Sequence, residues 1–340
     1  MGIGYPLLLP LIASTVGVLA MSGCKTATSP AKSVLFTSAV VSEGPPIPIA
    51  TAGHAGGLVD GMPVVVGGSH WSDDRATKSW LQECFVYQKD HWVPGPSLPH
   101  GMSDGAYAFN ARGLYIVGGK DDKTPSNEVL QLAPHNGALK WESLTTFPET
   151  IESASAAIIA DTLYVTGGFS GEKASNKLWS LDLKDPNAAW KSLAPLPASP
   201  RGYSAFVAAG SQLYLFGGLV LPPYQKEVAL FGDAYRYDPF TNSWKQLDGF
   251  NLPGYAWTAT AVNDQQIMFT GRVAKLSETS GEVLLLDLNT LQVKNVGELV
   301  TPSCCMPAIP MGGETWWLPG GEPAANRVRS ARTSVVQLKR

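Results

Sequence analysis

A short apolar run that ends in a glycine pair returns about every fifty residues, and this repeat constrains the fold more than any other feature of the sequence. The copies read VVVGG at 64–68, LYIVGG at 114–119, LYVTGG at 163–168, LYLFGG at 213–218, IMFTGR at 267–272 and WWLPGG at 316–321. The second glycine advances in steps of 49 to 54 residues, with Arg272 in the fifth place. The chain therefore contains six units of one design.

Each unit contains the strands of one antiparallel sheet. After the glycine pair come a variable polar loop and a second apolar strand, at 84–88, 128–132, 178–183, 234–239 and 283–288. A Trp follows in four units, at Trp92, Trp141, Trp190 and Trp244, and Val293 takes its place in the fifth. The glycines suit a strand end where backbones crowd or φ is positive. We expect four-stranded blades with the Trp side chains packed between neighbouring blades.

The last unit is one strand short. After WWLPGG it has only SVVQL at 334–338, whereas VLFTSAVV at 34–41 precedes the first copy and has no partner there. We expect this N-terminal strand to complete the sixth blade, which closes the ring and leaves no open edge at the seam. The period is that of the kelch repeat. The predicted fold is all-β, a six-bladed kelch β-propeller over residues 34–340 with no second domain.

Composition and charge narrow the range of partners. Lys+Arg 25 against Asp+Glu 28 gives a net charge of -3, which argues against a nucleic-acid partner because such proteins carry a basic stripe. Hydrophobic residues at 44% and charged residues at 16% exclude a disordered chain. No CxxC, Cys/His ligand spacing or nucleotide motif is visible, so no metal or cofactor is expected.

The N-terminus has the features of an export signal. The apolar run at 7–21 has the length of a signal-peptide core and is short for a membrane span. Ser22-Gly23-Cys24 resembles the bacterial lipobox, in which Cys24 is lipidated, although Met21 stands where Leu is usual and no Lys or Arg precedes the run. We expect a signal peptide over 1–24 and a tether over 25–33.

This export signal predicts where the protein resides. We expect a periplasmic or outer-membrane protein that touches the membrane only through an N-terminal lipid. An ordinary cleaved signal peptide is the alternative. The sequence does not indicate an oligomeric state.

Three cysteines remain after Cys24, namely Cys84, Cys304 and Cys305. An odd number in an exported protein leaves at least one thiol free or an unusual pairing. Buried free thiols and a strained disulfide between the adjacent Cys304 and Cys305 both stay open.

Three stretches resemble one enzyme group more specifically than the repeat does. GGEPAANRVRSART at 320–333 is similar to the Gly-Glu-(Pro)…Arg-Thr segment of bacterial N-acetylneuraminate epimerases, also called sialic acid mutarotases. GGSHWSDDRATKSW at 67–80 and AGHAGGL at 52–58 resemble segments of the related cyclically permuted mutarotase-like group. The resemblance covers roughly 35–338 and is strong only at these stretches. It implies an isomerase that interconverts the anomers of N-acetylneuraminate or a related small acidic sugar.

The resemblance also implies a catalytic pair. In that group a Glu and an Arg a few residues later form the active site, and the matching residues here are Glu322 and Arg332. Their separation is longer than the pattern, so Arg329 stays open as the functional arginine. A carboxylate beside a guanidinium suits the reaction, because Glu322 can act as general acid/base while an arginine holds the substrate carboxylate.

Four further residues are candidates for substrate binding. Arg272 replaces a repeat glycine, Arg201 and His54 precede innermost strands, and Lys78 lies in the long loop of the first unit. Each has a structural alternative: an ion pair for the arginines, a satisfied buried imidazole for His54 and a solvated ammonium for Lys78. The alternative function is a non-catalytic kelch propeller that binds a glycan or a protein partner at the cell envelope.

Overall fold

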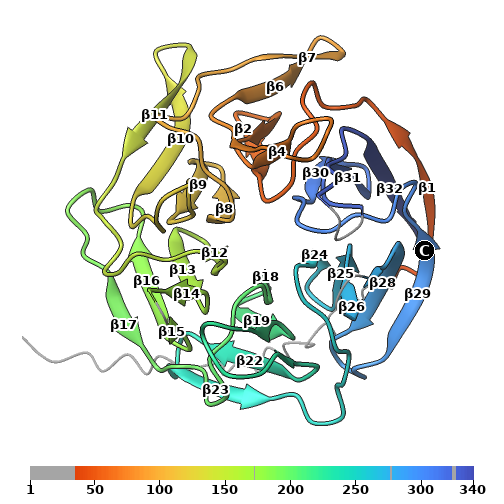
Figure 1. The fold of residues 1–340 in the computed structure, drawn as a ribbon. Helices are drawn as coiled ribbons and strands as arrows, with labels where there is room; N and C mark the ends of the chain where they lie inside the picture. Colours follow the sequence, from red (N-terminus) through yellow and green to blue (C-terminus); the bar gives the residue numbers. More distant parts are fainter. Residues whose placement is uncertain (1–34, 172, 276–277, 324–326) are drawn as a thin grey trace, which may run out of the picture. The chain divides into compact units, whose positions relative to one another are not determined.

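Six antiparallel sheets form a ring around a central axis in the computed structural model (Figure 1). The structure describes residues 35–340 except 172, 276–277 and 324–326. Residues 34–340 form one compact unit. The predicted signal peptide, Cys24 and the tether lie outside the described residues. In the part of the chain that is described, no helix is long and apolar enough to cross a membrane.

The first three blades follow one another along the chain, and their strands are given from the axis outward. The first blade comprises β2 (Ala55–Val59), β3 (Met62–Val66), β6 (Cys84–Gln88) and β7 (His91–Pro94). The second comprises β8 (Ala106–Asn110), β9 (Gly113–Val117), β10 (Val129–His135) and β11 (Ala138–Ser143). The third comprises β12 (Ser155–Ile159), β13 (Thr162–Thr166), β16 (Leu178–Asp182) and β17 (Lys191–Leu193).

The remaining blades complete the six. The fourth comprises β18 (Ala205–Ala209), β19 (Gln212–Phe216), β22 (Ala234–Asp238) and β23 (Ser243–Gln246). The fifth comprises β24 (Thr258–Asn263), β25 (Gln266–Thr270), β28 (Glu282–Asp287) and β29 (Val293–Glu298). The sixth comprises β30 (Ile309–Gly312), β31 (Thr315–Pro319), β32 (Thr333–Lys339) and β1 (Ser38–Gly44).

Two-stranded hairpins follow the glycine pair or its equivalent in four blades. They are β4 (Ser69–Trp71) with β5 (Lys78–Trp80), β14 (Phe169–Ser170) with β15 (Lys173–Ala174), β20 (Leu219–Val220) with β21 (Ala229–Leu230), and β26 (Val273–Lys275) with β27 (Glu278–Thr279). Each hairpin begins directly after the glycine pair or its equivalent, at the same end of its blade.

Strand β1 closes the ring, as the sequence predicts. It pairs with β32 along its whole length, from Ser38 opposite Lys339 to Gly44 opposite Thr333. The strand begins four residues later than the predicted segment at 34–41. Phe36, ahead of it, is buried and exchanges two hydrogen bonds with the Gln266 side chain of the fifth blade, at 2.8 and 3.0 Å.

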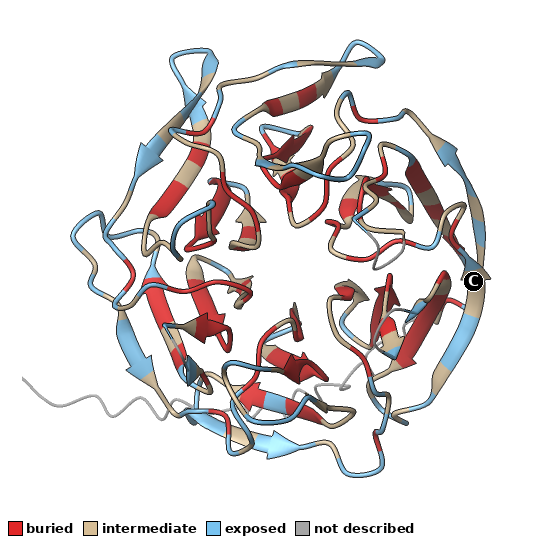
Figure 2. Ribbon diagram, viewed as in Figure 1, coloured by how far each residue is buried: buried red, intermediate tan, exposed pale blue. Residues whose placement is uncertain are grey.

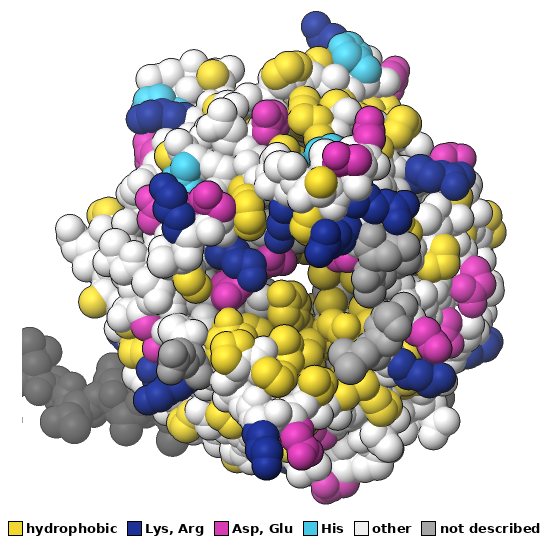
Figure 3. Space-filling model, viewed as in Figure 1, with side chains coloured by type: hydrophobic (Ala, Val, Ile, Leu, Met, Phe, Trp, Pro, Cys, Tyr) yellow, Lys and Arg dark blue, Asp and Glu magenta, His cyan; other side chains and the backbone are white. Residues whose placement is uncertain are grey.

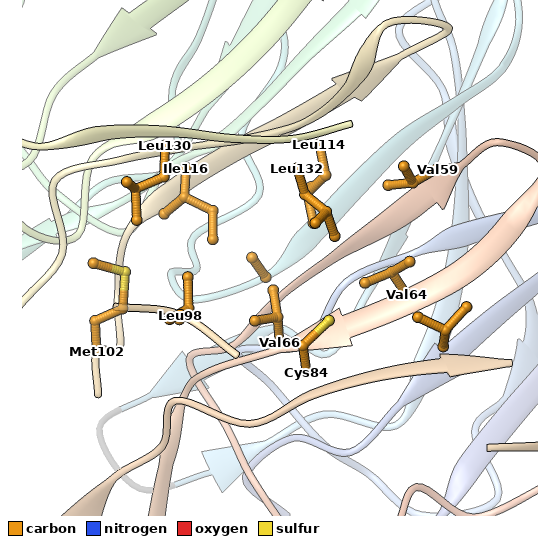
Figure 4. Packing of buried hydrophobic residues seen from close by; sticks show 12 residues of the cluster. Val59, Val64, Val66, Cys84, Leu98, Met102, Leu114, Ile116, Leu130 and Leu132 are labelled. Atoms are coloured by element: carbon orange, nitrogen blue, oxygen red, sulfur yellow. The ribbon is translucent and has the colours of Figure 1, made fainter. Parts of the chain in front are cut away.

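The hydrophobic core lies between the blades. Buried residues concentrate on the inner strands, and exposure is confined mostly to the outermost strands and the turns (Figure 2). Between the first two blades, Val59 and Val64 pack with Leu114 and Leu132, and all four are fully buried (Figure 4). Full burial of one such side chain contributes about 1.5–3 kcal/mol, so the contacts between blades supply much of the stability of the ring.

The repeated Trp side chains pack between blades, which confirms the prediction. Trp141 donates its indole N–H to the carbonyl of Pro96, at 2.7 Å, and Trp244 donates to Ala194, at 2.8 Å. Each acceptor lies in the segment that leads out of the preceding blade. These indoles are therefore structural, and each bonds its blade to the segment that leaves the preceding blade.

The glycine pairs have the backbone conformation that the sequence predicts. Gly168 has φ +86°, and a Cβ on it would lie 2.7 Å from the carbonyl oxygen of Glu152. Only glycine satisfies both constraints without strain. The chain can therefore turn sharply from each second strand into the loops near the axis.

A closed belt of six backbone hydrogen bonds surrounds the axis, one from each blade to the next. Its members all have left-handed backbones, with φ between +53° and +67°, and they are Gly53, Asp104, Ser153, Tyr203, Ala256 and Cys305. Each N–H donates to the carbonyl of the preceding member at 2.8–3.0 Å, and Gly53 donates to Cys305 to complete the circle. The belt holds the side chains near the axis in fixed positions.

Candidate functional site

An axial cavity of about 340 Å³ lies inside the ring. The belt residues line it together with the innermost strands β8, β12, β18 and β24. Its polar lining includes Asp104, Ser153, Tyr203, Cys305 and His54, whereas Glu322 and Arg329 lie outside its lining. The cavity therefore reaches Asp104 but not Glu322 or Arg329.

Each blade contributes two more residues next to the belt, and the two form a β-bridge with each other. We call these residues together the mouth. The residue after each glycine pair or its equivalent forms a β-bridge with the residue that precedes the belt. The six bridges are Ala52–Ser69, Ser103–Lys120, Glu152–Phe169, Gly202–Leu219, Tyr255–Val273 and Cys304–Glu322. Because the backbone is the same in all six blades, the side chains alone give the mouth its chemistry.

The mouth has a charged side and an apolar side. Lys and Arg gather at the edge of the opening over blades 6, 1 and 2, and hydrophobic side chains cover the edge over blades 3, 4 and 5 (Figure 3). On the apolar side, Tyr224 stacks on Phe169 with ring centroids 4.1 Å apart. The ring centroids of Phe169 and Tyr203 are 6.0 Å apart, and those of Tyr203 and Tyr255 are 6.3 Å apart. These rings form an aromatic wall opposite the charges.

Glu322 and Arg329 form an ion pair on the charged side, with Oε2 and Nη1 3.0 Å apart. Their side chains are 23% and 9% exposed, respectively. Arg329 also donates to the carbonyl and hydroxyl of Ser69, at 3.2 and 3.3 Å. Glu322 exchanges two backbone hydrogen bonds with Cys304, so both partners are fixed.

The surroundings of Glu322 change its acidity. Burial raises its pKa and outweighs the opposing effect of the Arg329 guanidinium, and the carboxylate of Asp104 raises it further. A carboxyl group with a raised pKa is suited both to accept and to return a proton near neutral pH.

Arg332 lies outside this cluster. It pairs with Glu43 of β1 at 2.9 Å, and both side chains are about half exposed. The chain turns back after Glu322, since Ser330 donates to the Gly321 carbonyl and its hydroxyl accepts from the Arg332 N–H. This turn carries Arg329 over the first blade and leaves Arg332 at the start of β32, facing β1. Of the two arginines left open by the sequence, the structure brings Arg329 to Glu322.

Lys78 lies on the charged side, where the charges of Asp104 and Glu322 act on it. It stands on β5 opposite Trp71, and its ammonium is 4.8 Å from the centroid of the Trp80 ring. Burial lowers its pKa, and the charges of Asp104 and Glu322 oppose that shift. Among the described residues no carboxylate forms a direct ion pair with it, so Lys78 can bind an external anion.

Arg201 and Arg272 are engaged in structural contacts away from the cavity. Arg201 is 1% exposed, pairs with Asp233 and lies 3.7 Å over the Phe231 ring. Arg272 pairs with Glu282 at 2.8 Å. Neither arginine lines the axial cavity. Their geometry is that of the structural alternative, an ion pair within the blade.

His54 is buried beside the belt, and its burial makes a testable contribution to stability. Burial lowers its pKa to about 4, with Arg329 adding to the shift and the Pro319 carbonyl opposing it. The unfolded chain therefore binds a proton here, below pH 6.5, that the folded chain does not. The contribution of neutral His54 to the free energy of unfolding is therefore fully present above pH 6.5 and is lost as the pH drops toward 4.

We expect His54 to account for about 3 kcal/mol of the loss of unfolding free energy between pH 6.5 and 4. Urea unfolding of the wild type and of His54→Gln across this range measures the contribution. The variant should show the shallower pH dependence. Parallel curves for the two proteins would contradict the prediction.

No group of three or more His, Cys, Asp or Glu side chains is placed to hold a metal ion within the described residues. Cys84, Cys304 and Cys305 are free thiols, and the first two are buried. The hydrogen bond with Cys304 and burial raise the pKa of Cys305 well above its usual value.

Sequence reasoning missed Asp104 and Lys120, which both lie on the charged side. Lys120 pairs with the buried Glu152, which also accepts from the Tyr224 hydroxyl. The repeat itself contained the signal. Each belt residue stands 15 or 16 positions before the second glycine or its equivalent, and Lys120 directly follows the pair. Aligning the six units on these positions would have identified both residues.

Comparison with known proteins finds similarity to one family. Residues 144–295 match the model of the N-acetylneuraminate epimerase family. The matched range contains the third and fourth blades and most of the fifth. It ends before Glu322 and Arg329, so the site residues are assigned from geometry.

Curated relatives show the same similarity over a shorter range. N-acetylneuraminate epimerases of Salmonella enteritidis PT4 and Salmonella typhimurium LT2 are 28% identical to this chain over 74 residues. That stretch is 22% of this chain and 19% of the length of each relative. The resemblance to this family seen in the sequence is confirmed, and the activity is a proposal.

Proposed function

We propose that the chain is an isomerase that interconverts the anomers of N-acetylneuraminate or a related acidic sugar at the charged side of the mouth. The observation that carries the proposal is the mostly buried Glu322–Arg329 pair at the mouth of a propeller whose residues 144–295 match the epimerase family. In this proposal the arginine beside the general acid/base Glu322 is Arg329 and not Arg332.

The reaction requires two proton transfers. The anomeric hydroxyl loses a proton, the ring oxygen gains one, and the bond between the anomeric carbon and the ring oxygen breaks to give the open keto form. Rotation and reclosure on the other face give the second anomer. Glu322 exchanges one of these protons, and Arg329 holds its carboxylate in place. A positioned acid/base of this kind contributes about 10²–10⁴-fold to the rate.

The mouth also fits the rest of such a substrate. Lys78 supplies the ammonium that binds the sugar carboxylate, because its charge has no acid in direct contact. The aromatic wall of Phe169, Tyr203, Tyr224 and Tyr255 offers an apolar surface to the opposite side of the sugar. An acidic sugar has one charged side and less polar C–H faces, which matches this division.

Anomer exchange followed by NMR tests the proposal. Purified protein should accelerate the equilibration of N-acetylneuraminate anomers above the rate in buffer. Ligand binding without acceleration, across several keto-acid sugars, would replace it with the non-catalytic glycan-binding alternative.

We further propose that the protein is exported and held by a lipid at Cys24. The support is the lipobox-like segment that ends in that cysteine. Fractionation of cells should recover the wild type with the membranes and Cys24→Ala in soluble form. Equal distribution of the two proteins would contradict lipid anchoring.

A further inference from the structure

The first blade contributes only small residues to its part of the mouth and belt. They are Ala52, Gly53 and Ser69, so the space above this blade is open to side chains from both neighbours. Arg329 reaches in from the sixth blade and donates to Ser69. Asp104 reaches in from the second blade.

The carboxylate of Asp104 lies directly against Gly53. A Cβ on Gly53 would be 2.6 Å from Oδ1 of Asp104 and 3.3 Å from its Cγ. A side chain at position 53 would therefore displace this carboxylate. The absence of a side chain at Gly53 leaves room for an acid at the centre of the charged side.

Asp104 is held rigidly in this position. Its N–H donates to Gly53 and its carbonyl accepts from Ser153, both at 2.8 Å, as part of the belt. The Ser103 hydroxyl donates to Oδ2 at 2.9 Å. Its φ is +58°, a conformation that Asp tolerates better than most residues.

Asp104 and Glu322 stand on either side of the first blade's position in the belt. In the belt Gly53 is bonded to Cys305, and the adjacent Cys304 is bridged to Glu322, so the two acids are separated by one blade position. The charge of Asp104 acts on Glu322, on Lys78 and on Tyr203. Two carboxylates thus share one site with the cations Arg329 and Lys78.

We propose that Asp104 is a second catalytic carboxylate of this site, which serves one of the two reacting sugar oxygens while Glu322 serves the other. This inference rests on the proposed function. In the opening step, ionised Asp104 takes the proton of the anomeric hydroxyl. Protonated Glu322 gives its proton to the ring oxygen as the ring C–O bond breaks. Reclosure reverses both transfers, so the enzyme regains its starting protonation.

The environment of Glu322 supports the acid role given to it. Burial and the neighbouring Asp104 charge raise the pKa of Glu322, which favours its protonated form. Arg329 and Lys78 act on Glu322 in the opposite direction. Acid and base roles separate in this way when one of two neighbouring carboxyl groups is kept protonated.

Asp104→Asn tests the proposal, with Asp90→Asn as the matched control. Asp90 also has a left-handed backbone, φ +64°, and is exposed in the β6–β7 turn away from the axis. Asp104→Asn should slow anomer exchange by about 10²–10⁴-fold, and Asp90→Asn should keep the wild-type rate. A rate for Asp104→Asn equal to that of Asp90→Asn would overturn the inference.

A second measurement does not depend on activity. In a ¹³C NMR titration the pKa of Glu322 should fall in Asp104→Asn, because a neighbouring negative charge is removed, and should not change in Asp90→Asn. An unchanged Glu322 titration would overturn the inference even if the wild type proved inactive. Should Asp104→Asn fold poorly, Asp104→Ser replaces it in both measurements, since the third blade already has serine at this belt position, Ser153.

Discussion

Glu322→Gln is expected to slow anomer exchange by about 10²–10⁴-fold and to leave sugar affinity nearly unchanged. The amide fills the same space and still offers an oxygen to Arg329, so the mouth keeps its shape. It cannot accept or return a proton, and the step that needs this group loses its catalyst. NMR exchange rates together with calorimetric binding separate the two effects.

The control for this variant is Glu314→Gln. Glu314 lies in the same blade, in the turn between β30 and β31, and pairs with Arg340 at the surface. Its substitution should change neither rate nor affinity. An unchanged rate in Glu322→Gln would remove the acid/base role, and the protein would then be a binding module.

Arg329→Met should slow anomer exchange, whereas Arg332→Met should not. Arg329 is mostly buried against Glu322 and Ser69, so its loss leaves an acid without its cation. The pKa of Glu322 should rise further and the rate should fall by at least about tenfold, since removing one partner of a buried pair costs roughly 3–5 kcal/mol before the acid neutralises. The pH profile of the rate should shift upward accordingly.

Arg332→Met removes only an exposed pair with Glu43. Solvent screens such exposed pairs and they add little to stability, so this variant should keep wild-type rate and stability. The measurements are exchange rates against pH and thermal unfolding. A loss of rate in Arg332→Met that equals the loss in Arg329→Met would restore the assignment that the family resemblance first implied.

The propeller could be predicted from the sequence because the residues that specify each blade recur along the chain. Six apolar runs that end in Gly-Gly or a variant specify six second strands, and the missing strand of the last unit indicates β1 as its partner. The limits of β1 were less accurate, because Phe36 is bound to Gln266 of another blade and not to its own sheet. No local sequence pattern indicates the contact between Phe36 and Gln266.

The candidate site was predicted only in part, because it depends on how loops turn. Glu322 was identified from the resemblance of 320–333 to the epimerase segment. The choice between Arg329 and Arg332 is decided by the turn at Ser330, which local spacing does not reveal. Asp104 was missed because its importance comes from Gly53, fifty-one residues earlier in the chain and adjacent to it only in the closed belt.

The pairing of β1 with β32 has a consequence for biosynthesis. The ribosome produces β1 before any of the first five blades, yet its partner in the sixth sheet, β32, is made after all of them. Glu322 and Arg329 lie on the segment between β31 and β32, so they too are made after the first five blades. A chain that terminates before β32 therefore leaves β1 without this partner, and one that terminates before Glu322 also lacks the proposed catalytic pair.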